Sequence, residues 1–279
     1  MLALGIMVGW GRDSFGTFMS RIIAIANQKG GVGKTTTAVN LAAGLAASSK
    51  TVLLVDLDPQ GNATMASGIE KQGLEHSVTE LLLGESTLAQ TLVASAEGYD
   101  LIPCNIDLIA VELQLMDEPN REGRLKQALQ PVRDSYDFII IDCPPSLSLL
   151  TLNALAAADG IIVPMQCEYF ALEGLSSLIN TINALKQKLN PVLEVDGIVR
   201  TMYDVRNNLA NAVSHELTTH FGDTVYRTLV PRNVRLAEAP SHGMSIIRYD
   251  KCSRGALAYL GLAGEVIQRM NKKSVKEKV

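Results

Sequence analysis

"IIAIANQKGGVGKTTTAVN", residues 22–40, joins a β-branched run to a glycine-rich loop and then to a helix-forming segment. A strand, a loop and a helix in this order are typical of a phosphate-binding loop, whose backbone N–H groups hold phosphate oxygens. The pattern G-x-x-x-x-G-K-[ST] is met at its end by residues 33–35, but Gln28 replaces its first glycine. A second lysine, Lys29, stands at the mouth of the loop. A turn that only connected a strand to a helix would not explain it.

The loop predicts a specific chemistry for each of its side chains. Lys34 is expected to reach the β- and γ-phosphates, and the Thr35 hydroxyl is expected to bind Mg²⁺. Asp142 ends the apolar run "FIIID", the place of a Walker-B carboxylate that orients Mg²⁺ through water. A buried Asp that caps a turn is the alternative for this residue.

Two further carboxylates follow another apolar run. In "VDLDPQGN", Asp56 and Asp58 lie two residues apart and would project to one side of an extended strand. One could contact the metal shell while the other positions an attacking water. A plain strand-end turn rich in Asp, Pro and Gly remains the alternative.

Strand-like and helix-like runs alternate along the rest of the chain, which predicts an α/β fold. The β-branched runs indicate strands buried on both faces, and the intervening amphipathic runs indicate helices. We therefore expect a single-domain P-loop NTPase with a mostly parallel, twisted sheet and helices on both faces. Ligands of such sheets bind at the carboxyl ends of the strands, where the loop, Asp58 and Asp142 converge. Further strands are expected at residues 51–56, 138–142, 160–165, 195–201, 224–230 and 245–248, with helices at 147–158, 173–189 and 253–270.

Length and composition set the broad class. The chain has 279 residues, 47% of them apolar but only 5% aromatic, so the core is expected to rest on Ala, Val, Ile and Leu. Four cysteines form no C-x-x-C pair, which favours reduced thiols in a cytosolic protein. Residues 1–18 are interpreted as a disordered extension or a start site placed too far upstream. The ATPase domain is expected at 19–271, followed by a basic flexible tail at 272–279.

The charge is unevenly distributed along the sequence. Residues 1–196 carry a balance of −10, whereas residues 197–279 carry +6. A basic C-terminal third on an acidic protein suggests a face that meets a polyanion. An ordinary solvated surface with a lysine-rich tail is the alternative.

Five segments together identify a family. "KGGVGKTTT", "LLVDLDPQGN", "FIIIDCPPSL", "PMQCEYFALEGL" and "VPRNVRLAEAPSHG" closely resemble the ParA/Soj chromosome-partitioning ATPases, of the deviant Walker-A group. The resemblance extends from about Met19 to Met270. It implies an Mg²⁺-dependent ATPase, slow alone, that forms a homodimer around ATP and is stimulated by a ParB-like centromere-binding protein. It also implies cytoplasmic, nucleoid-associated localisation and no membrane binding.

The resemblance assigns roles to individual positions. Lys29 matches the lysine that crosses the dimer interface to the partner's nucleotide, much as an arginine finger acts in trans. Asp58 matches the carboxylate that sets up the hydrolytic water in the metal shell, and Gly30 lies where the two halves approach closely. Lys34, Thr35 and Asp142 keep the roles given above. The nucleotide-binding residues are then Lys29, Gly30, Gly31, Val32, Gly33, Lys34, Thr35 and Thr36, with Thr201, Met202, Pro231 and Asn233 near adenine.

The same resemblance implies nonspecific binding of double-stranded DNA in the ATP state. Arg206 and Arg235 fall at the family's DNA-contact positions, and Arg232 and Lys251 are weaker candidates. The stretch at residues 211–226 departs from the family because it is poor in Lys and Arg. We therefore expect weaker DNA binding, or a greater dependence on the tail lysines at positions 272, 273, 276 and 278.

Three rival functions are considered. A MinD-like switch could act on a membrane or a protein partner. Membrane switching needs an amphipathic C-terminal helix, and "NKKSVKEKV" offers few apolar residues for one. An iron-protein-type electron donor needs two cluster cysteines per subunit, and Cys143 follows the Walker-B Asp too closely. A nucleotide-gated binding module with little turnover differs from the main interpretation chiefly in its rate.

Overall fold

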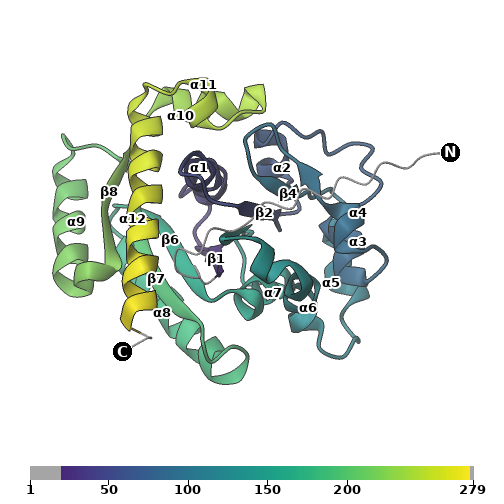
Figure 1. The fold of residues 1–279 in the computed structure, drawn as a ribbon. Coiled ribbons are helices and arrows are strands. Elements are labelled where there is room, and N and C mark those ends of the chain that lie inside the picture. Colours follow the sequence, from purple (N-terminus) through teal and green to yellow (C-terminus); the bar gives the residue numbers. More distant parts are fainter. Residues whose placement is uncertain (1–19, 277–279) are drawn as a thin grey trace.

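The computed structural model describes residues 20–276. The extension expected at residues 1–18 and the last three residues of the expected tail lie outside this range. Within it, the chain forms one sheet with helices packed on both faces, as Figure 1 shows.

The sheet has eight strands in the order β3-β4-β2-β5-β1-β6-β7-β8, and β3 alone pairs antiparallel. This confirms the predicted mostly parallel α/β sheet. β1 stands at its centre, between β5 and β6. The strands are β1 (Arg21–Ile25), β2 (Val52–Asp56), β3 (Val93–Ala94), β4 (Asp100–Ile102), β5 (Phe138–Asp142), β6 (Gly160–Gln166), β7 (Glu194–Tyr203) and β8 (Val225–Pro231).

Two hydrophobic cores cover the two faces of the sheet. Alternate residues of β1 point to opposite cores, because side chains alternate along a strand: Ile22 and Ala24 join one core, and Ile23 and Ile25 join the other. The first core is closed by α3 (Val78–Leu83), α5 (Leu108–Gln114), α6 (Arg124–Leu129), α7 (Leu149–Ala157), α8 (Ala171–Lys188) and α9 (Asn208–Phe221). The second is closed by α1 (Lys34–Ala47), α2 (Asn62–Ala66), α11 (Ile246–Tyr249) and α12 (Arg254–Lys276). The short α4 (Leu88–Thr91) and α10 (Val234–Glu238) complete the helices named here.

Two sequence expectations were wrong in detail. The run at residues 245–248 is not a strand. Ser245 caps the short helix α11, accepting a hydrogen bond from the Arg248 N–H. The short strands β3 and β4 were not predicted, because two and three residues are too few to show a period.

The final helix also runs further than expected. α12 ends at Lys276, so residues 272–276 continue the helix where a flexible tail was expected. Lys273 explains part of this extension, since its ammonium donates to Asp196 Oδ1 at 2.8 Å and to Glu194. These two acids begin β7, so the end of α12 is tied to the amino edge of the sheet.

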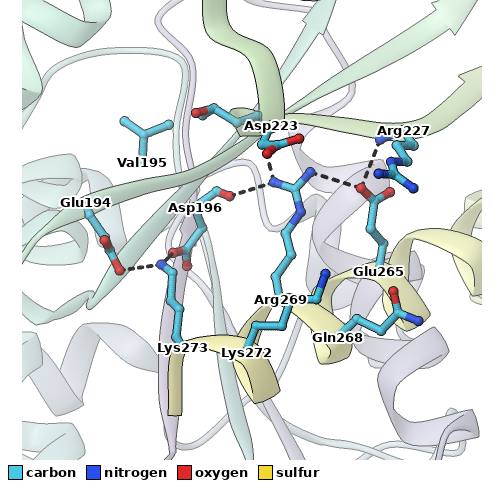
Figure 2. A pocket seen from close by; sticks show the side chains of 11 residues that line it. Glu194, Val195, Asp196, Asp223, Arg227, Glu265, Gln268, Arg269, Lys272 and Lys273 are labelled. Carbon is cyan, nitrogen blue, oxygen red and sulfur yellow. Dashed lines mark hydrogen bonds and ion pairs between the residues drawn. The ribbon is translucent and has the colours of Figure 1, made fainter. Parts of the chain in front are cut away.

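A charged cluster surrounds a cavity of about 460 Å³ at that edge (Figure 2). The Asp196 side chain is fully buried and accepts from Arg21 at 2.6 Å and from Lys273. Next to it, Arg269 donates to Glu265 at 2.9 Å, and its guanidinium lies 3.9 Å from the centre of the Tyr226 ring. Since β7 and β8 begin here, this cavity lies at the opposite edge from the phosphate-binding loop.

Replacing Asp196 by asparagine is expected to destabilise the fold by about 2–4 kcal/mol. The change leaves two cations facing a neutral amide in a buried cluster. Glu194→Gln is the matched control, because that side chain is 42% exposed and should cost about 1 kcal/mol or less. Urea unfolding of both variants measures the difference, and equal losses would show that burial of Asp196 is not what makes the cluster stabilising.

Candidate nucleotide-binding site

The glycine loop between β1 and α1 is held in place by the neighbouring strands. Asn27 donates to the Pro164 carbonyl of β6 at 2.8 Å and accepts from the Lys29 N–H at 2.9 Å. Thr201 of β7 donates to the Val32 carbonyl at 2.8 Å. Gly31 and Gly33 have φ of 72° and 86°, a region that favours glycine. These contacts and backbone angles fix the course of the loop.

Lys34 opens α1 and is buried although it is charged. Its ammonium donates to the Lys29 carbonyl at 3.3 Å, so the side chain folds back over its own loop. Burial lowers the pKa of Lys34, and the nearby Asp142 carboxylate opposes this effect. A buried cation is thus held against the backbone of the loop in which Lys34 was predicted to bind phosphate.

Asp142 lies at the end of β5, beside the loop. In the sheet register it pairs with Ile25 of β1 on one side and with Asp56 of β2 on the other. Its carboxylate is fully buried, and neither oxygen has a hydrogen-bond partner within the described part of the chain. Burial first, and the Asp56 charge second, raise the pKa of Asp142 well above its ordinary value, while the Thr35 hydroxyl acts in the opposite direction.

The two carboxylates that follow β2 have different environments. Asp56 is fully buried, and its Oδ2 accepts from both the backbone and the hydroxyl of Thr64 at 2.7 Å. Burial raises the pKa of Asp56 to about 6. Asp58 lies beyond the strand, where its Oδ1 accepts from the Gln60 N–H at 3.0 Å. Asp56 therefore anchors α2, and Asp58 is the better candidate for the chemistry.

These residues fit a magnesium ion. A buried carboxylate without a hydrogen-bond partner, Asp142, lies close to the Thr35 hydroxyl. Mg²⁺ usually takes few protein ligands and fills its shell with water and phosphate oxygens. Among residues 20–276, no group of three or more His, Cys, Asp or Glu is arranged to hold a metal by itself.

Lys29 points away from the loop that carries it. Its ammonium forms an ion pair with Glu168, which follows β6, and the Lys29 side chain is half exposed. At Gly30 an added β-carbon would meet no atom within 4 Å, so the mouth of the loop faces open space. An ion pair this exposed contributes little stability, about 0–1 kcal/mol.

The residues predicted near adenine lie close to the loop. A β-carbon placed on Gly33 would lie 3.9 Å from both Thr201 and Met202. Met202 has φ of 49°, a strained value for this residue type. Pro231 ends β8, the strand beside β7, and Asn233 caps α10 by accepting from the Arg235 N–H at 2.8 Å. The structure therefore brings these four residues to one edge.

The four predicted DNA-contacting cations are exposed: Arg206 follows β7, Arg232 follows β8, Arg235 lies on α10 and Lys251 follows α11. Arg206 is paired with Asp204 at 2.8 Å. The hydrogen bonds from Arg206, and to a lesser extent the charge of Arg232, lower the pKa of Asp204. Arg235 is paired with Glu238 at 3.0 Å and lies 3.8 Å from Asp250. Lys273, by contrast, is bound at the amino edge of β7, so this tail lysine does not join them.

Sequence reasoning missed several residues that shape the site. Asn27 orders the loop and could have been found, because an Asn after a strand often hydrogen-bonds nearby backbone. Glu168 and Thr64 gave no signal, since their roles depend on contacts between distant segments.

The comparisons with known proteins agree with this geometry. The AAA domain family matches residues 20–195. The protein Soj of Bacillus subtilis is 54% identical over 89% of this chain and 98% of its own length. The chromosome partitioning protein ParA of Myxococcus xanthus is 49% identical over 98% of this chain and 97% of its own.

A solved structure is also similar. Cobyrinic acid a,c-diamide synthase of Mycobacterium smegmatis, with bound ADP and magnesium, has a TM-score of 0.80 at 39% identity. It covers 91% of this chain and 96% of that one. Among residues 20–276, no helix is both long and apolar enough to cross a membrane.

Proposed function

Because this chain belongs to the ParA/Soj family of chromosome-partitioning ATPases, we propose that it forms an ATP-sandwich dimer that binds DNA without sequence preference. It is an ATP hydrolase whose cofactors are ATP and Mg²⁺. The observation that most strongly supports the nucleotide-binding part of the proposal is the buried carboxylate of Asp142 beside Lys34, whose oxygens have no hydrogen-bond partner among the described residues. A ParB-like centromere-binding protein stimulates hydrolysis, and the dimer associates with the nucleoid in the cytoplasm.

Each side chain of the site has a role in this proposal. When bound, Mg²⁺ neutralises charge on the β- and γ-phosphates. Thr35 and Asp142 hold it, Lys34 binds the phosphates, and Asp58 orients the attacking water. Lys29 leaves Glu168 and reaches the partner's nucleotide. Each nucleotide is therefore contacted by both lysines, Lys34 from its own subunit and Lys29 from the partner, only in the dimer. Hydrolysis is thereby tied to dimerisation.

The exposed cations after β7 and β8, on α10 and after α11 supply the DNA-binding surface. These are Arg206, Arg232, Arg235 and Lys251, and they contact phosphates, which explains binding without base readout. The nearby acids, Asp204 and Glu238, reduce this positive charge, in keeping with the weak binding expected from the sequence.

The proposal is tested by binding of nonspecific duplex DNA to the wild type and to Asp58→Ala. Binding is measured with ATP, with ADP and without nucleotide, over a salt series. The proposal expects binding with ATP alone, retained in the variant and falling steeply with salt. Absence of binding in every state at low salt would favour the alternative, a MinD-like positioning switch with a protein or membrane partner.

Replacing Asp204 by asparagine is expected to strengthen DNA binding about three- to tenfold at low salt. The change releases Arg206 from its ion pair and removes a negative charge beside Arg232. Asp117→Asn is the matched control, since it makes the same charge change on an exposed residue of another region. Fluorescence anisotropy with labelled DNA measures both, and an equal gain in the two variants would mean that net charge alone is responsible.

A further inference from the structure

The backbone of Asp58, the residue proposed to orient the attacking water, is held on both sides. Its N–H donates to Asp56 Oδ1 at 3.2 Å. Its carbonyl accepts from the Gly61 N–H at 2.8 Å and from the Cys104 thiol at 3.1 Å. Asp56 ends β2, whereas Cys104 follows the neighbouring strand β4, and both are fully buried. The position of Asp58 therefore depends on how the ends of these two strands are held relative to each other.

One hydroxyl group joins the two side chains that hold Asp58. The Thr64 hydroxyl donates to Asp56 Oδ2 at 2.7 Å and accepts from the Cys104 N–H at 2.9 Å. A hydroxyl has a single proton to donate, and here it goes to the carboxylate. Thr64 lies on α2 and is fully buried. Its hydroxyl thus closes a buried network that runs from the end of β2 to the segment after β4.

Attachment of α2 to the sheet does not require this hydroxyl. The backbone N–H of Thr64 already donates to the same oxygen of Asp56 at 2.7 Å, and that bond is independent of the side chain. What the hydroxyl adds is the bond to Cys104. Without it, the Cys104 N–H would lose its partner in a place closed to solvent, and its segment would have to shift to find another.

We propose that Thr64 is a positioning residue for ATP hydrolysis. Its hydroxyl fixes Asp56 and Cys104 relative to each other, and these two residues hold Asp58 where its carboxylate orients the water. The inference rests on the proposed function, because it requires Asp58 to act on that water. A small shift is enough to matter, since a misplacement of about 1 Å in a catalytic group can cost about 10²-fold in rate.

The test compares two substitutions of Thr64 in single-turnover ATP hydrolysis. Thr64→Val removes the hydroxyl and is expected to lower the rate about 10- to 100-fold while ATP binding changes less than about threefold. Thr64→Ser keeps the hydroxyl and should stay within about threefold of wild type. Thr91→Val is the matched control, because Thr91 is also fully buried and its hydroxyl donates to the Thr87 carbonyl at 3.0 Å, on α4. It should lower the Tm but not the rate.

A double-mutant cycle shows whether Thr64 acts through Asp58. In an Asp58→Ala background, Thr64→Val should change the remaining hydrolysis by less than about twofold, because the group that it positions is gone. Hydrogen exchange of the ligand-free protein gives a second readout that needs no turnover. The amides of Asp58 and Gly61 should exchange faster in Thr64→Val than in wild type, and at the wild-type rate in Thr91→Val.

Cys104→Ala keeps the test decisive if Thr64→Val does not fold. It removes the thiol bond to the Asp58 carbonyl and should lower hydrolysis about three- to tenfold, again only when Asp58 is present. Wild-type hydrolysis by Thr64→Val, an equal loss in Thr64→Ser, or an equal loss in the Asp58→Ala background would overturn the inference alone. Wild-type hydrolysis by Asp58→Ala itself would overturn the proposed role of Asp58 as well, so the two failures are distinguishable.

Discussion

Lys29→Ala is expected to lower ATP hydrolysis about 10³-fold while leaving the fold and the binding of ATP to one subunit nearly unchanged. The lysine pairs with Glu168 at the surface and does not reach into its own loop. Its loss therefore costs the subunit little, because exposed ion pairs contribute about 0–1 kcal/mol. Under the proposed function, Lys29 acts on the partner's nucleotide, where a cation supplied in trans is worth roughly 10³–10⁵-fold in related phosphoryl transfers.

Two variants separate the charge of Lys29 from dimerisation. Gly30→Val adds a side chain in open space, so the subunit should fold and bind ATP but fail to dimerise. Glu168→Gln releases Lys29 and should leave hydrolysis equal or faster. Turnover is measured at several protein concentrations with a labelled nucleotide to report binding. If Lys29→Ala lost ATP binding by the single subunit as strongly as Lys34→Ala, the role in trans would be wrong.

The parts of the fold that could be predicted are those specified within one segment. The loop at residues 27–35 shows its function in sequence because glycines, lysines and a flanking strand act over a few positions. Asp142 was predictable as the last residue of a buried run, and the sheet then placed it beside Ile25. The mostly parallel sheet with helices on both faces was predictable for the same reason, and the structure confirms it.

What could not be predicted depends on which distant residues meet. Asp56 and Asp58 look equivalent in sequence, but the helix hydroxyl of Thr64 binds Asp56 and leaves Asp58 for the loop. Both carboxylates were predicted to project to one side of an extended strand. That prediction does not hold, because β2 ends at Asp56 and Asp58 lies beyond it. In the same way, the acids that begin β7 extend α12 by holding Lys273, which a local reading of a lysine-rich tail does not reveal. The sequence likewise did not reveal that Asp204 forms an ion pair with Arg206 and so reduces its positive charge.

Asp142→Asn is expected to stabilise the ligand-free protein by about 1–3 kcal/mol near pH 8 and to lower hydrolysis about 10²–10³-fold. The carboxylate is fully buried and unpartnered within the described residues, so its charged form costs free energy in the folded state. An asparagine removes that charge at nearly the same volume. The catalytic loss follows because the amide is a poorer ligand for the metal. A gain of this size should raise the Tm by about 2–4 °C per kcal/mol in a chain of this length.

The sign of the pH dependence distinguishes this cause from a change in packing. The folded pKa of Asp142 lies above its ordinary value of 3.8, so the folded state holds the proton over a pH range in which the unfolded state has released it. Stability contributed by this group therefore falls as pH rises through that range, and it is not lost at lower pH. The advantage of the variant should be smaller near about pH 4, close to the pKa of the unfolded state, than near about pH 8 in thermal unfolding without ligand. Added Mg²⁺ and ATP should reverse the order, because wild type gains binding free energy that the variant lacks. A variant equally stabilised at both pH values would show that the buried charge is not the cause.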